Sequence, residues 1–212
     1  MEAQSPIVLW RRPAKRGPET PLVVLLHGRG ADEADLIDLA ASLPSSFAYA
    51  SVRAPHPTDE GGYTWFQDRG VGRPIAASVK SSIGMLRTWL DGPDVAKYNR
   101  KRTFVLGFSA GMMMAGALAL DDPERFAGCV LLSGAIAFDA SVDTSNGRLA
   151  GLPVFYGYGE SDVVVPRELV ARSDRYLRDG SGAVLTDRGY PHGHSIGNRE
   201  IADIRAWFDS LP

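Results

Sequence analysis

Short apolar runs alternate with longer amphipathic segments along most of this sequence. Seven runs of four or five residues consist largely of β-branched, aromatic and leucine side chains, and several are continuously apolar. A strand that is buried on both faces of a sheet has this pattern. We therefore expect strands at residues 7–10, 22–26, 48–52, 103–107, 128–132, 154–158 and 183–187.

Three other segments have the pattern of helices. Pro74 begins a stretch with apolar residues at helical spacing, and the sequence Asp-Gly-Pro-Asp ends it. Residues 110–120 are almost wholly apolar, and the C-terminal segment places Ile201, Ile204, Phe208 and Leu211 on one helical face. Strands that alternate with helices predict an α/β protein with a mostly parallel central sheet flanked by helices. We find no repeat or linker, so a single domain over residues 1–212 is expected.

Composition narrows the classes of partner. The chain is 44% apolar and 23% charged, as in ordinary globular proteins, and its net charge of −2 provides no basic face for nucleic acid. No apolar stretch approaches the roughly 20 residues needed to cross a bilayer, so stable membrane insertion is not expected. The one cysteine, Cys129, lies in an apolar run and is expected to be a buried, inert thiol. These features favour a soluble, cytoplasmic protein, and a monomer or homodimer with a small-molecule substrate is expected.

Candidate chemistry begins at the stretch VLGFSAGMMM, residues 105–114. Ser109 is flanked by Gly107 and Gly111, with an expected strand before it and an expected helix after it. This is the context of the G-x-S-x-G nucleophile elbow, which presents a serine at the carboxyl edge of a sheet. Because the helix begins at once, the free N–H of Ala110 would face negative charge that develops beside the hydroxyl.

A nucleophilic serine needs a histidine base that a carboxylate orients. In this architecture the chain order is serine, acid, histidine. Two of the four histidines, His27 and His56, precede Ser109, which leaves His192 and His194.

The candidate acid is Asp162, which follows the apolar run 154–158 by a few residues. Glu160, Asp139 and Asp143 are its rivals, and Asp162 could instead only cap a turn. From the residues alone, the acid and the histidine both remain open.

Five blocks of sequence, taken together, resemble one family. They are LLHGRGADEADL, GFSAGMMMA, DDPERFAGCVLLSG, ESDVVVP and YPHGHSIGNREIADIRAWF, and the resemblance covers nearly the whole chain from Leu22 to the end. Their order and spacing are similar to those of the phospholipase/carboxylesterase family of α/β hydrolases, which includes the acyl-protein thioesterases. The resemblance implies the α/β-hydrolase fold and a catalytic triad of Ser109, Asp162 and His194.

The resemblance also implies an oxyanion hole. By similarity, its two donors are the backbone N–H groups of Arg29 and Ala110, while His27 is a structural hydrogen-bonding residue. The chain departs from the family at two places. Ala110 stands where the thioesterases commonly have glutamine, and Tyr-Gly precedes Glu160 where the family often has His-Gly.

The segment 54–74 is the candidate substrate-binding loop. It is long and rich in glycine and proline, and by resemblance Tyr63, Trp65 and Phe66 would line an acyl or alcohol pocket. The alternative is an aromatic cluster that only fixes the loop. Between residues 133 and 154 only about 20 residues are available, too few for a cap domain. An uncapped site favours broad esterase activity, and Met112–Met114 are expected in the core.

Other function classes fit the sequence less well. A metallohydrolase could use His192 and His194 as an H-x-H pair, but three or four ligands are needed and the other histidines lie in unrelated blocks. A dienelactone-hydrolase-like enzyme would have cysteine in place of Ser109. A catalytically inactive binding protein on the same fold is the main alternative. We therefore expect a serine hydrolase that needs no cofactor or metal and cleaves esters, or thioesters, of small molecules or acylated substrates.

Overall fold

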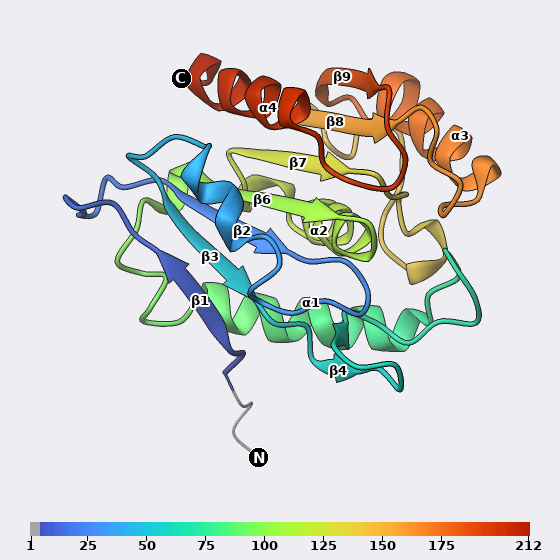
Figure 1. Cartoon of the computed structure of the whole chain (residues 1–212), viewed down its shortest axis with the longest axis horizontal. Coiled ribbons are helices and arrows are strands. Elements are labelled where there is room, and N and C mark those ends of the chain that lie inside the picture. Colours follow the sequence, from blue (N-terminus) through green and yellow to red (C-terminus); the bar gives the residue numbers. More distant parts are fainter. Residues whose placement is uncertain (1–4) are drawn as a thin grey trace.

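A seven-stranded sheet forms the centre of the molecule (Figure 1). The computed structural model describes residues 5–212. The strand order is β1-β3-β2-β6-β7-β8-β9; β1 pairs antiparallel with β3, and the other neighbouring pairs are parallel. The bounds are β1 (Val8–Arg11), β2 (Leu22–Leu26), β3 (Ala48–Val52), β6 (Thr103–Phe108), β7 (Gly128–Leu132), β8 (Pro153–Gly159) and β9 (Val184–Tyr190). All seven expected strands are present, which confirms the predicted mostly parallel α/β fold.

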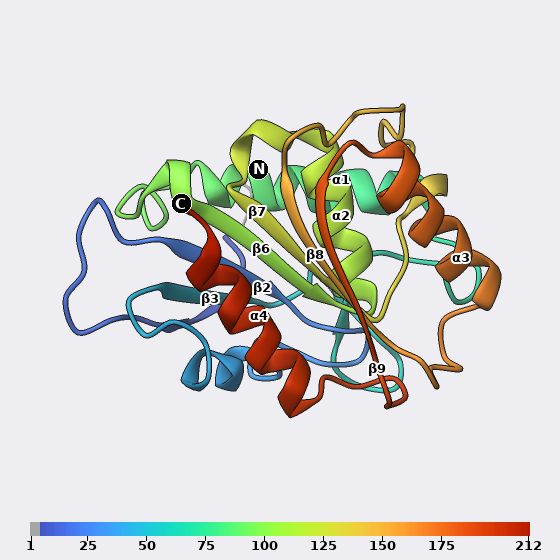
Figure 2. The ribbon, with the colours of Figure 1, turned by 90° about the horizontal axis from the view of Figure 1, so that it is seen from above.

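Helices cover both faces of this sheet (Figure 2). Helices α1 (Ala76–Leu90) and α2 (Ala110–Asp121) lie on one face, while α4 (Asn198–Ser210) and the 3-10 helix η1 (Ile37–Ala41) lie on the other. Helix α3 (Arg167–Arg175) lies beside the edge formed by β8 and β9. The sequence analysis assigned no helix to α3. The short elements are β4 (His56–Pro57), β5 (Tyr63–Thr64), η2 (Arg100–Arg102), η3 (Pro123–Arg125), η4 (Phe138–Ala140) and the π-turn η5 (Tyr176–Gly180).

Two apolar clusters, one on each face, form the core. In β2, Leu22, Val24 and Leu26 belong to the cluster beneath α1 and α2, while Val23 and Leu25 belong to the cluster beneath α4. Successive side chains of a strand point to opposite faces, so a strand covered on both sides must be apolar throughout. All residues of α2 from Gly111 to Leu120 are buried, which explains why this helix has no polar face.

The topology brings distant loops to one edge of the sheet. From β2 the chain moves to β3 on one side, whereas β6, β7 and β8 follow one another on the other side. The order therefore reverses between β2 and β6, and in open α/β sheets ligands bind beyond the carboxyl ends of the strands at such a point. The residues that follow β2, β6, β8 and β9 all leave the sheet at this edge.

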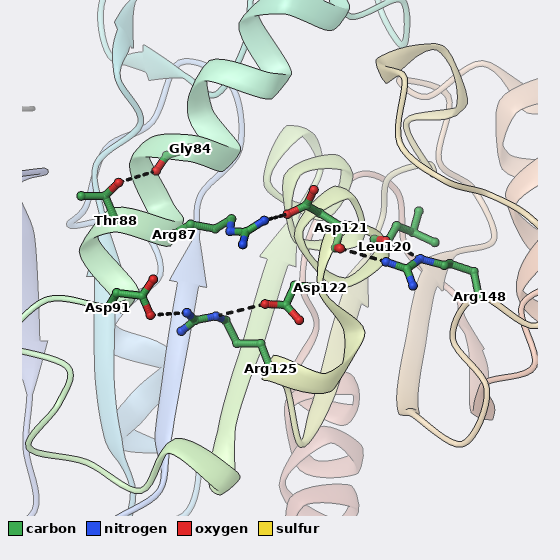
Figure 3. A network of polar contacts seen from close by, with 9 residues as sticks. All are labelled: Gly84, Arg87, Thr88, Asp91, Leu120, Asp121, Asp122, Arg125 and Arg148. Atoms are coloured by element: carbon green, nitrogen blue, oxygen red, sulfur yellow. Dashed lines mark hydrogen bonds and ion pairs between the residues drawn. The ribbon is translucent and has the colours of Figure 1, made fainter.

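At the C-terminal end of α2, arginine side chains connect neighbouring elements (Figure 3). Arg87 of α1 donates to Asp121 over 2.7 Å, and Arg125 joins Asp91 and Asp122. Arg148 donates to the backbone oxygens of Leu120 and Asp121 over 2.7 and 2.8 Å, which satisfies carbonyls left free at the helix C-terminus. No helix within residues 5–212 is long and apolar enough to cross a membrane.

Candidate active site

Ser109 lies in a strained turn between β6 and α2. Its φ and ψ are 56° and −118°, and its N–H donates to the Leu132 carbonyl of β7 over 2.9 Å. A Cβ added at Gly107 would lie 2.1 Å from the Gly111 carbonyl oxygen, and one added at Gly111 would lie 1.9 Å from the Leu26 carbonyl oxygen. Glycine is therefore required on both sides, because the turn packs backbone against backbone.

Three side chains from separate loops are connected by two polar contacts, with His194 in the middle. His194 Nε2 lies 2.9 Å from Ser109 Oγ, and His194 Nδ1 lies 2.7 Å from Asp162 Oδ2. The other carboxylate oxygen of Asp162 accepts from the N–H of Val164 over 2.8 Å, which fixes its orientation. With a proton on Nδ1 shared with the carboxylate, Nε2 is free to accept the serine proton.

Within residues 5–212, none of the rival carboxylates named from the sequence forms a hydrogen bond or ion pair with Ser109 or His194. Glu160 and Asp139 are exposed, and Asp143 accepts from the N–H of Ser145 over 2.9 Å. His192 lies 3.3 Å from Glu200, and its ring stacks on Tyr190. Among these candidates, the structure brings Asp162 and His194 to Ser109.

His27 has the structural role expected of it. Its Nδ1 lies 2.7 Å from the Gly28 carbonyl, its Nε2 accepts from the N–H of Ala54 over 3.1 Å, and its side chain is fully buried. Burial lowers the pKa of the imidazole, so the ring is held in the neutral form. His27 therefore attaches the end of β2 to the start of the 54–74 segment.

Two backbone N–H groups, those of Arg29 and Ala110, belong to residues that line the same cavity as Ser109 and have no acceptor within residues 5–212. Ala110 is the first residue of α2, where an N–H has no partner within the helix. Within residues 5–212 the N–H of Arg29 donates no hydrogen bond, whereas the next one, of Gly30, donates to the Tyr63 carbonyl over 2.9 Å. The side chain of Arg29 pairs with Asp68 over 2.8 Å.

A cavity of about 430 Å³, here called the Ser109 cavity, opens in front of these groups. Its walls combine the polar residues of the site with an apolar surface. The apolar part comprises Phe66, Val71, Met113, Ala135, Val164 and Val165, and the remaining lining residues include Arg29, Thr64, Asp68, Ser109, Ala110 and His194.

The three aromatic residues predicted to line the pocket separate in the structure. Phe66 lines the Ser109 cavity, but Tyr63 and Trp65 are not among its lining residues. Trp65 is fully buried, and its Nε1–H donates to the His27 carbonyl over 2.8 Å. The ring of Tyr63 lies under the guanidinium of Arg53 at 4.6 Å. For Tyr63 and Trp65 the expectation of a pocket position is corrected: they hold the loop, because their contacts are to the backbone and the arginine behind it.

Sequence reasoning missed several residues of the cavity wall. Met113 was expected in the core with Met112 and Met114, which are fully buried there, but Met113 also reaches the Ser109 cavity. Val164 and Val165 line it as well. The available signal was the run of three valines, residues 163–165, directly after the candidate acid.

No group of three or more histidine, cysteine, aspartate or glutamate side chains in residues 5–212 is arranged to hold a metal ion. Cys129 is buried, and burial raises the pKa of its thiol. The segment between β7 and β8 contains, as regular structure, only the short helix η4, so no cap covers the Ser109 cavity from there.

Comparison with known proteins supports the same family. Residues 13–211 match the phospholipase/carboxylesterase family. A Bacillus subtilis protein named "Putative hydrolase MhqD" is 27% identical over 198 residues, which cover 92% of this chain and 95% of that protein. The "Probable inactive carboxylesterase" of Oryza sativa subsp. japonica is 26% identical over 215 residues, covering 92% and 86%.

A solved structure extends the comparison to the fold. The Bacillus cereus carboxylesterase superposes with a TM-score of 0.82 at 22% identity and covers 97% of this chain and 94% of that one. The family match spans almost the entire chain, and the fold matches as well. The chain therefore belongs to the phospholipase/carboxylesterase family of α/β hydrolases.

Proposed function

We propose that this protein is a serine hydrolase that cleaves carboxylic esters through an acyl-enzyme formed on Ser109. The observation that carries the proposal is the continuous contact from Ser109 through His194 to Asp162, with distances of 2.9 and 2.7 Å. Hydroxyl, imidazole and carboxylate in this order are the arrangement that makes a serine nucleophilic.

The first half of the reaction forms the acyl-enzyme. Ser109 Oγ attacks the carbonyl carbon while His194 Nε2 takes the hydroxyl proton, and Asp162 stabilises the imidazolium that results. The tetrahedral oxyanion accepts hydrogen bonds from the N–H groups of Arg29 and Ala110. The ester bond then breaks, and His194 gives its proton to the departing alcohol.

The second half of the reaction hydrolyses the acyl-enzyme and regenerates free Ser109. A water molecule loses a proton to His194 and attacks the acyl carbon, the oxyanion is stabilised by the same two donors, and Ser109 recovers its proton as the acid leaves. A thioester passes through the same steps with a thiol as the leaving group. Thioesters are therefore proposed as a second class of substrate.

The apolar walls of the Ser109 cavity support an acyl chain as the group bound there. Phe66, Met113 and Val165 provide side chains that can enclose methylene groups, and methionine adapts to chains of different shape. Acylated small molecules are the proposed substrates. A cytoplasmic location and a monomeric or homodimeric state remain predictions.

The alternative is a catalytically inactive binding protein on the same fold. One observation in its favour is that the relative from Oryza sativa is named a probable inactive carboxylesterase. In this chain, however, Ser109, His194 and Asp162 are all present and in contact. This geometry favours catalysis over binding alone.

Labelling with a fluorophosphonate, followed by peptide mass spectrometry, tests the proposal. We expect modification at Ser109 in the native protein and none in Ser109→Ala. Hydrolysis of p-nitrophenyl esters of increasing chain length then defines the acyl preference, and a chelator should leave the rate unchanged. Labelling elsewhere, or full activity in Ser109→Ala, would overturn the proposal.

A further inference from the structure

A second cavity, here called the outer cavity, adjoins the Ser109 cavity. Its volume is about 640 Å³, and Gly70 and Val71 line both cavities. The two cavities therefore share part of one wall. A substrate that reacts at Ser109 and is long enough to pass these two residues would meet the groups that line the outer cavity.

Three arginines line the outer cavity: Arg69, Arg73 and Arg172. None of them forms an ion pair with an acidic side chain of residues 5–212, although Asp139 and Glu168 belong to the same walls. The lining thus carries three positive and two negative side chains, and the positive ones keep their donors free. A guanidinium offers donors in a planar fork that matches a carboxylate.

The backbone brings two of these arginines together. Arg69 N–H donates to the Arg73 carbonyl over 3.0 Å, and Arg73 N–H donates to the Gly70 carbonyl over 2.9 Å, so residues 69–73 form a tight turn. Gly72 in this turn packs against α3, because a Cβ there would lie 2.1 Å from Leu169 Cδ1. The turn and α3 are therefore two walls of the outer cavity, and Asp139 of η4 completes the lining beside them.

The third arginine comes from α3. The guanidinium of Arg172 lies 3.9 Å from the ring centroid of Phe138, which fixes its plane and leaves its edges free to donate. Asp68, at the start of the turn, does not neutralise the cluster, since it accepts from Arg29 over 2.8 Å and from the N–H of Gly70 over 3.2 Å. Positive charge from both walls thus faces the outer cavity.

We infer that the outer cavity binds a free carboxylate at the far end of the substrate, through Arg69, Arg73 and Arg172. The preferred substrates are then esters that carry this carboxylate on the acyl chain or on the alcohol. This inference rests on the proposed function, because it describes the part of the ester that lies beyond the scissile bond.

Matched pairs of esters test the inference. For the acyl side, the pair is the mono-p-nitrophenyl ester of suberic acid and its methyl ester, which has no charge. For the alcohol side, it is the butyrate ester of 6-hydroxyhexanoate and that of its methyl ester. In one pair at least, we expect kcat/KM for the charged member to exceed that for the neutral member by about tenfold at low salt, with the advantage falling as salt is added.

Arginine variants connect this preference to the cavity. Arg69→Gln, Arg73→Gln and Arg172→Gln should each raise KM for the charged ester about two- to fivefold, and the triple variant should abolish the preference, while the neutral ester is hydrolysed as before. Arg175→Gln is the matched control: it removes the same charge from α3 at an exposed residue that does not line the outer cavity. Equal losses on both esters, or none, would overturn the inference.

A binding measurement separates this inference from the proposed function. Suberate is titrated calorimetrically into Ser109→Ala, with and without the three arginine substitutions. The inference fails, and the proposed hydrolase function stands, if two results occur together. These results are equal hydrolysis of charged and neutral esters by the native protein, and an affinity for suberate that is the same with and without the three arginine substitutions. If no ester is hydrolysed but suberate binding requires the arginines, the proposed function fails and the anion site remains. The absence of both hydrolysis and binding would overturn both.

Discussion

Some residues that line the Ser109 cavity have neighbours in the sequence that are of the same or a similar type but do not line the cavity. His194 and Phe66 belong to the cavity wall, whereas His192 and Trp65, two residues and one residue away, do not line the cavity and are here called the layer. His194 contacts Ser109, but His192 stacks on Tyr190 beside a buried carboxylate. Residue type therefore does not decide whether a side chain serves chemistry or stability; the contacts around it do.

The largest expected effect is a loss of activity at His194. Replacing His194 by alanine removes the base and should lower kcat about 10⁵-fold, while the free energy of unfolding changes little. The same replacement at His192 should lower kcat by less than about tenfold, because its ring does not touch Ser109. Steady-state hydrolysis of a p-nitrophenyl ester, with circular dichroism to verify folding, measures both. Similar losses in the two variants would remove the distinction between wall and layer.

The acid provides the next test. Asp162→Asn keeps the shape of the side chain but reverses the preferred tautomer of His194, so kcat should fall about 10⁴-fold. Its control is Glu160→Gln, which changes a neighbouring exposed carboxylate and should leave kcat within about threefold. If the two variants exchanged these outcomes, Glu160 would be the acid.

Trp65 and Phe66 distinguish stability from specificity. Trp65→Ala should lower the free energy of unfolding by about 3–5 kcal/mol, because it opens a buried space and leaves the His27 carbonyl without its donor. The folded fraction should keep the native preference for acyl-chain length. Phe66→Ala should shift that preference towards longer esters, because it enlarges the Ser109 cavity. Urea unfolding and a panel of esters measure the two effects, and a shifted preference in Trp65→Ala would place Trp65 in the wall.

The smallest effect concerns Glu200, whose side chain is fully buried beside His192. Burial raises the pKa of this carboxyl, with His192 and the Gly197 N–H opposing the shift and Asp203 adding to it. The folded state then holds the proton more tightly than the unfolded state, so stability falls as pH rises above the ordinary glutamate pKa of about 4.3. Glu200→Gln lacks this titration, so its stability relative to the native protein should improve from about pH 5 to about pH 8.

Urea midpoints at the two pH values measure this change. The exposed residue Glu124 provides the control, since Glu124→Gln should show no such pH dependence relative to the native protein. A Glu200→Gln variant whose stability runs parallel to that of the native protein would show that the carboxyl is not held protonated by burial.

Most of the fold was predictable because it depends on periodicity. Continuous apolar runs located every strand of the large sheet, and helical spacing located α1, α2 and α4. The elements that were missed carry little hydrophobic signal. Strands β4 and β5 have two residues each, and α3 is mostly polar, with Ser173 as its one buried residue. Ser173 accepts from the N–H of Ile136 over 2.8 Å, a contact that no local pattern reveals.

The candidate site divides in the same way. The sequence alone located Ser109 in an elbow, because strand, glycine and helix signals are local, and it restricted the base to His192 or His194. Only the tertiary structure brought Asp162 and His194 to Ser109, turned Trp65 into the core and Phe66 toward the Ser109 cavity, and placed the three arginines around one cavity. The physical reason is that regular elements repeat at fixed intervals, which fixes the face a side chain takes, whereas loops have no such interval. In loops, the direction of a side chain is decided by packing against residues far away in the sequence.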